Sequence, residues 1–166
     1  DSPIISHLIQ KLETSNEKVT FSRVDADVID NLIKKENEEI SKLNDKEKEK
    51  LKIIIEENVP KEKYTVQLEA MDSAASPFII TFPEFMRRMK EMQQSGGNSM
   101  FGNMPEMYNL IVNVNNPINS EILKSKNKDK KQRLINQSLD LAKLSQNLLK
   151  GEDLTSFIKR SIDFIK

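Results

Sequence analysis

Hydrophobic residues along this chain switch between helical spacing and strand spacing in a definite order. Apolar positions three or four residues apart predict a helix that begins at Pro3 and another that begins after Asn44. Asn44 and Glu47 form the sequence signature of a capping box. Between Pro60 and Pro117 the apolar period shortens to two, which predicts strands. The pattern therefore indicates a chain that mixes helices and strands.

Three strands are expected in the middle of the chain, at residues 64–70, 78–82 and 108–114. A small polar turn at residues 72–76 separates the first two, which predicts a hairpin. With helices on one face, these strands predict an α+β fold with a small three-stranded, mainly antiparallel sheet. A separate alternating stretch at residues 18–24 predicts a further strand.

Two helices are expected at the C-terminal end, at residues 129–149 and 153–165, with Gly151 as the stop after the first. The longer helix carries two apolar stripes that together span roughly 220° of its circumference. A helix that packs only on its own sheet needs a stripe roughly 100° wide, so the second stripe needs another partner. That partner is either the last helix of the same chain or a second copy, which would form a dimeric four-helix bundle.

The residues of the longer helix divide cleanly between the two stripes. One stripe consists of Ile135, Leu139, Ala142 and Leu149. If a second copy is the partner, the other stripe and positions on the last helix form the homodimer interface. The interface residues are Leu134, Leu141, Leu144, Leu148, Ile158, Ile162 and Ile165.

Six of the seven methionines fall between Met86 and Met107, interleaved with phenylalanine. They begin on an expected helix at residues 83–94 whose opposite face is basic, and a Gly-bearing segment at 95–99 follows. Met is flexible and polarizable, which suits either an adaptable binding surface or plain core packing, and the spacing alone slightly favours core. The candidate surface residues are Phe85, Met86, Met89, Met92, Met100 and Phe101.

Composition narrows the classes of function. Lysine plus arginine and aspartate plus glutamate each number 26, so there is no net basic field for nucleic acid. Cysteine is absent, which excludes disulfides and thiol chemistry and is compatible with the cytoplasm. His7 is the only histidine, so no Ser-His-acid set can be built, and no catalytic or metal-ligating residue is assigned. No apolar run is long enough to span a membrane.

The chain divides into three parts by composition. Residues 1–24 carry their own apolar stripe and are interpreted as a remnant of a preceding domain. Residues 25–44 form a charge-dense connector, and residues 45–166 form the main domain. Because the chain begins at Asp1 rather than at Met, we expect an excised fragment.

Short motifs in a fixed order resemble the C-terminal domain of the ninety-kilodalton heat-shock chaperones, in particular the bacterial high-temperature protein G type. The order is a strand after Ser76-Pro77, a Met-bearing helix, a Gly segment, and a strand that ends in Asn113-Val114-Asn115-Asn116-Pro117. Where the family has Asn-Pro-Asp-His-Pro, only Asn113 and Pro117 match. The family's Leu-Glu-Asp-Pro is matched by Glu152-Asp153, with Leu154 in place of the proline, and Phe157-Ile158-Lys159-Arg160 is similar to Phe-Ile-Arg-Arg.

The resemblance implies a specific function for the chain. The family's last two helices form a constitutive dimer, and its amphipathic helix, matching residues 85–92 here, contacts unfolded or partly folded client proteins. ATP and magnesium belong to an N-terminal domain that this chain lacks, so no cofactor is expected in the chain itself. The alternative hypothesis is a structural α+β adaptor whose methionines are core and which binds no client. An enzyme ranks third, because no catalytic set is available.

Overall fold

The computed structural model describes most of the chain in two compact units. The residues described are 3–16, 19, 21, 40–83, 86 and 107–165. One unit is formed by Asp1–Lys35 with Phe82–Met107, and the other by Glu36–Thr81 with Tyr108–Lys166. The second unit contains the sheet and the C-terminal helices.

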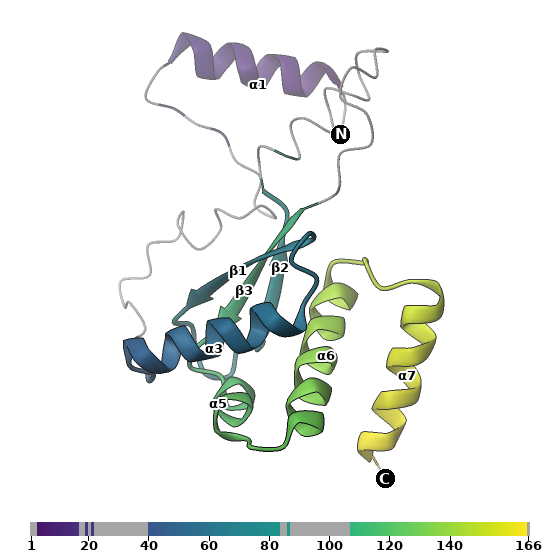
Figure 1. Cartoon of the computed structure of the whole chain (residues 1–166). Helices are drawn as coiled ribbons and strands as arrows, with labels where there is room; N and C mark the ends of the chain where they lie inside the picture. The colour runs from purple at the N-terminus through teal and green to yellow at the C-terminus, as the bar shows by residue number, and fades with distance from the viewer. Residues whose placement is uncertain are drawn as a thin grey trace. The chain divides into compact units, whose positions relative to one another are not determined.

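In the first unit, helix α1 spans Pro3–Ser15, which confirms the predicted start at Pro3 (Figure 1). Three of its apolar side chains are exposed: Ile5, Leu8 and Leu12. Of the strand predicted at 18–24, only Val19 and Phe21 are described, and neither lies in a strand. The backbone N–H of Phe21 donates to the Glu13 carboxylate at 2.8 Å, which joins this segment to α1.

The second unit opens with helix α3, Asp45–Asn58, and its predicted capping box is confirmed. The Asn44 side chain accepts from the Glu47 N–H, and the Glu47 carboxylate accepts from the Asn44 N–H, both at 3.0 Å. Strands β1 (Tyr64–Glu69) and β2 (Phe78–Thr81) follow. The unit is completed by β3 (Tyr108–Asn113) and the helices α5 (Pro117–Lys124), α6 (Lys128–Ser145) and α7 (Gly151–Ile165).

The strand order is β1-β3-β2, so the predicted hairpin between the first two strands is wrong. β1 pairs with β3 in parallel and β2 pairs with β3 antiparallel, which makes the sheet mixed rather than mainly antiparallel. The physical reason lies in the burial of the strands. Leu110, Ile111 and Val112 are all buried, as suits a central strand covered on both faces, whereas β1 alternates buried and exposed positions. The α+β class itself is confirmed.

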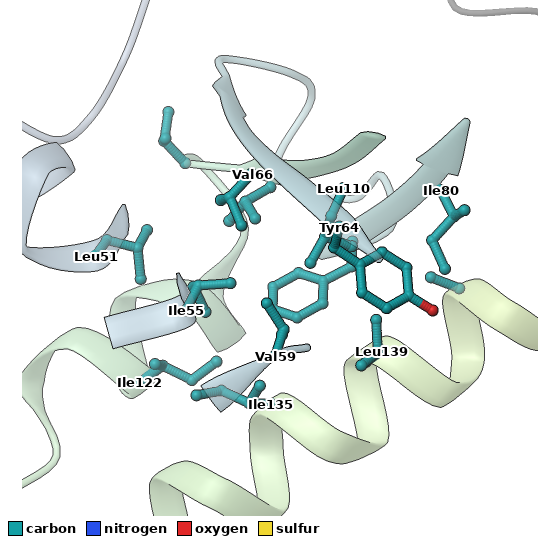
Figure 2. Close-up of a cluster of buried hydrophobic side chains, with 14 of the residues drawn as sticks. Leu51, Ile55, Val59, Tyr64, Val66, Ile80, Leu110, Ile122, Ile135 and Leu139 are labelled. Carbon is teal, nitrogen blue, oxygen red and sulfur yellow. The ribbon is translucent and has the colours of Figure 1, made fainter. Parts of the chain in front are cut away.

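One face of the sheet and three helices enclose the core (Figure 2). Alternate residues of the strands point to this face, and α3 and α6 supply the facing side chains, with α5 beside them. Across the sheet, Val66 stands opposite Leu110, and Leu110 opposite Ile80, so one row of the core crosses all three strands. Leu51, Ile55, Ile122 and Ile135 are completely buried against it.

A set of buried asparagine side chains fixes the segments around the end of β3. The Asn113 amide accepts from the Met71 N–H and donates to the Asp72 carbonyl, which holds the loop between β1 and β2. The Asn115 side chain accepts from the Lys42 N–H at 2.8 Å, which ties the chain entering α3 to the segment that follows β3. Further amide contacts with this loop come from Asn116 and Asn119. Buried amides of this kind replace the tight hairpin turn that the sequence had suggested.

Helix α5, Pro117–Lys124, follows the end of the third strand, in a segment for which the sequence predicted no element. Asn116 caps it by accepting from the Ile118 N–H at 2.9 Å, and Pro117 occupies the first turn. An Asn-Pro pair at a helix start is a recognisable signal because Asn favours the N-cap and Pro favours the first helical position. The same Asn-Pro pair also ends the preceding strand, so a strand stop alone does not reveal the helix.

The predicted boundary between the last two helices is also corrected. Helix α6 ends at Ser145, and Asn147, with φ 56°, is the left-handed residue that stops it. The N–H of Asn147 donates to the Leu144 carbonyl and that of Leu148 to the Lys143 carbonyl, which is the Schellman arrangement. Gly151, with φ +59°, instead begins α7.

Candidate functional site

The candidate site is the apolar surface of α6 and α7 that faces away from the core. On α6, Ile135, Leu139 and Ala142 are buried against the sheet, so the first predicted stripe is core. The other stripe lies on the opposite side of the helix, since residues advance about 100° each. Its members Leu141 and Leu144 are 45% and 44% exposed. An amphipathic helix should bury its apolar stripes, so this second stripe lacks a partner within the described chain.

The turn after α6 also places one leucine in solvent and the next in the protein interior. Leu148 is exposed while its neighbour Leu149 is 3% exposed. Because the Schellman turn at Asn147 reverses the chain direction, consecutive leucines face opposite environments. Leu134, assigned from the sequence to the interface, is only partly buried and packs against the core of its own unit.

Helix α7 also has a buried side and an exposed apolar side, but fewer of its side chains are buried than on α6. Phe157 is its only buried side chain among residues 151–163. Ile158 and Ile162, both assigned to the interface, are each 49% exposed. The side chain of Ile165 lies outside the described residues. We define the outer face as Leu141, Leu144, Leu148, Ile158 and Ile162.

Polar side chains join α7 to α6, and the sequence analysis did not find them. The Gln137 amide donates to the Ser161 hydroxyl at 2.9 Å. The Arg160 guanidinium forms an ion pair with the Asp140 carboxylate, and the Lys143 ammonium reaches the same carboxylate at 3.1 Å. Asp140 and Arg160 stand twenty residues apart in the chain, so no local spacing marks them as a pair.

A polar cleft of about 250 Å³ lies beside these contacts, where α6 and α7 meet the end of α3. Asn58, Asn136, Asp140 and Asp153 are among its lining residues. Burial raises the pKa of the Tyr64 phenol above its ordinary value of 10.0, and the Asp140 and Asp153 carboxylates add to the rise. Lys143 and Arg160 also line the cleft, so it contains side chains of both charges.

The candidate client surface lies almost wholly outside the described residues. Of its six members, Met86 alone is described, and it is helical and half-buried. The others are Phe85, Met89, Met92, Met100 and Phe101. His7 lies on α1, and its side chain is also outside the description. Within the described ranges, no group of three or more His, Cys, Asp or Glu side chains is placed to hold a metal ion.

Comparison with known proteins gives a consistent result for nearly the whole chain. The chaperone protein HtpG of Bacteroides thetaiotaomicron is 31% identical over 95% of this chain. The corresponding protein of Bacteroides fragilis is 32% identical over 99% of it. HtpG of Porphyromonas gingivalis is 36% identical over 74% of it. No family model matches the chain.

The aligned regions cover nearly all of this chain but only part of each Bacteroides relative. The chain spans about a third of the length of the two Bacteroides relatives. Their alignments run over 226 and 233 positions, more than the 166 residues of the chain, so both relatives include residues that have no counterpart in this chain. None of the helices in the described part of the chain is long and apolar enough to cross a membrane. Similarity at this level over almost the entire chain confirms the resemblance found in the sequence: the chain is a homologue of the HtpG chaperones and belongs to the ninety-kilodalton heat-shock family.

Proposed function

We propose that this chain is a dimerisation domain of a cytoplasmic, ATP-dependent chaperone, and that two copies associate through the outer face. The observation that carries the proposal is that α6 and α7 each leave a stripe of large aliphatic side chains exposed, at 44% to 49% of their area, and that Leu148 in the turn between them is 37% exposed. Monomeric proteins rarely leave contiguous apolar patches of this kind uncovered. Two α6–α7 pairs related by a two-fold axis would form a four-helix bundle and cover both stripes.

A charge placed on the outer face tests the location of the interface. Leu144→Asp should abolish dimerisation, because each dimer would bury two unpaired carboxylates at a cost of several kcal/mol. Ile53→Asp is the matched control, since Ile53 on α3 is 48% exposed and lies outside the outer face. Sedimentation equilibrium of both variants gives the dissociation constants. Equal effects of the two substitutions would remove the support for this interface.

The second part of the proposal is that the segment 83–94 contacts client proteins, while ATP turnover belongs to a part of the protein not included in this chain. The support is the amphipathic pattern of the segment and the chaperone character of the relatives. Met side chains repack at low cost, which suits a surface that accepts many partners.

Substitution of the Met surface separates client contact from the adaptor alternative. Met86→Ser with Met89→Ser should weaken binding to a chemically unfolded protein while leaving the thermal midpoint nearly unchanged. Met71→Ser is the control for core methionine, because Met71 is 6% exposed and its replacement should lower the midpoint. If the double variant loses several kcal/mol of stability instead, its methionines are core and the adaptor alternative stands.

A further inference from the structure

Helix α7 depends on few contacts for its position in the protomer. Phe157 is its only buried residue in the stretch 151–163, and the helix carries exposed isoleucines on another side. A single aromatic anchor fixes a point on a helix but leaves rotation about that point poorly defined. Additional contacts are therefore needed to set the direction in which the exposed stripe points.

Asp140 supplies one of these contacts. Asp140 is 8% exposed, and its two carboxylate oxygens accept hydrogen bonds from different cations. One oxygen accepts from the Lys143 ammonium one turn along α6, and the other accepts from the Arg160 guanidinium on α7. The Gln137–Ser161 hydrogen bond lies about one helical turn away on the same pair of helices. Together with Phe157, these two contacts hold α7 at more than one point.

Apart from Lys143–Asp140, which shares the same carboxylate, the Asp140–Arg160 ion pair differs from the others in the described part of the chain. Lys48–Asp45 and Lys52–Glu56 each connect residues one turn apart on the same helix, α3. Lys130–Glu121 connects two helices, but both side chains are about half exposed. At Asp140 and Arg160 the side chains are 12% and 32% exposed, so water and salt screen the pair less. When one partner of a sheltered ion pair is removed, the other charge stays desolvated and unpaired, which opposes orientations of α7 that separate Asp140 from Arg160.

We propose that Asp140, through Arg160, is a positioning residue for dimerisation: it orients α7 on α6 so that the two exposed stripes form one surface for a second copy. This inference rests on the proposed dimer. Only the fraction of protomers with α7 correctly oriented is competent to associate, and the apparent affinity falls in proportion to that fraction in each partner. The contact thus acts by preorganisation and not by touching the partner.

Substitutions at both ends of the ion pair provide the test. Asp140→Asn retains the shape of the side chain and removes its charge, and Arg160→Gln removes the other end at a less buried position. Because the contact occurs twice in a two-fold dimer, Asp140→Asn should weaken association about tenfold or more. The double variant should dimerise as tightly as the single variant with the lower affinity, since both single substitutions remove the same contact. Glu121→Gln, which breaks the exposed Lys130 pair on α6, is the matched control and should leave association unchanged.

A second readout distinguishes positioning from general destabilisation. In dilute, monomeric solution, Asp140→Asn should speed amide hydrogen exchange in α7 and leave exchange in the strands unchanged. Its near-ultraviolet signal should also persist, because the chain's two tyrosines both lie in the sheet.

Each outcome of these measurements bears on a defined claim. A wild-type chain that does not self-associate overturns the proposed dimer and this inference together. If the wild type is dimeric and the dimer dissociation constant of Asp140→Asn is within twofold of the wild-type value, the inference is overturned while the proposed dimer stands. Additive losses in the double variant would also overturn it, because the two residues would then act separately.

Discussion

Helix α6 presents two faces that are alike in composition and opposite in environment. Ile135 and Leu139 are buried against the sheet, whereas Leu141 and Leu144 leave nearly half of their area exposed. Burial of apolar area contributes about 25 cal/mol per Å², so the inner face stabilises the protomer, whereas the area left exposed on the outer face contributes nothing of this kind within the protomer. Hydrophobic periodicity therefore predicts that a helix face is buried, but it does not predict which surface buries that face.

The largest expected effect comes from placing the same charge on each face. Ile135→Asp should prevent folding or cost several kcal/mol, because an unpaired carboxylate would be buried where the side chain is 0% exposed. Leu141→Asp should change the free energy of unfolding of the monomer by less than about 1 kcal/mol. Urea unfolding in dilute solution measures both. A comparable loss at Leu141 would mean that the outer face belongs to the protomer's own core.

A smaller effect is expected in the dependence of thermal stability on protein concentration. If association covers the outer face, the midpoint of the wild type should rise by a few degrees for each tenfold increase in concentration. Leu144→Ser should abolish this dependence, whereas the core variant Leu139→Val should lower the midpoint and retain it. Differential scanning calorimetry over a hundredfold range provides the measurement. A wild-type midpoint independent of concentration would count against association through α6.

The sequence predicted the stripes and strands because they depend on local periodicity. The capping box at Asn44 and the three strands follow from residues that are close together in the chain. Strand order was not predictable in the same way, because β1 and β3 pair across more than forty residues. Similarly, the partner of Asp140 is set by how α6 packs against α7, and no local spacing encodes it.

The stop after α6 gives a finer test, since this turn sends Leu148 and Leu149 to opposite faces. Asn147→Gly should stabilise the protomer by up to about 1 kcal/mol, because glycine adopts a φ of 56° without steric cost. Asn147→Ala should cost about 1 kcal/mol at the same position. Chemical denaturation of the two variants measures the difference. Equal stabilities would contradict the left-handed stop.

The smallest effect concerns the inner face at high pH. Tyr64, which packs in the core with Leu139, has a pKa raised above 10.0, so the folded chain keeps the phenol protonated where the unfolded chain ionises. Stability is therefore fully present below pH 10.0 and falls as the pH rises from there through the raised pKa. Tyr64→Phe should flatten this alkaline part of the stability profile relative to the wild type, as pH-dependent urea unfolding would measure. An unchanged slope in Tyr64→Phe would assign the loss to other groups.

The molar mass of the wild-type chain tests the central claim most directly. Static light scattering at micromolar concentration should give about twice the protomer mass of 19.1 kDa, and the mass should fall toward that value on dilution. Leu144→Asp should give the protomer mass throughout. A wild-type chain that remains at 19.1 kDa at micromolar concentration would contradict the account, because the outer face would then have no second copy to cover it.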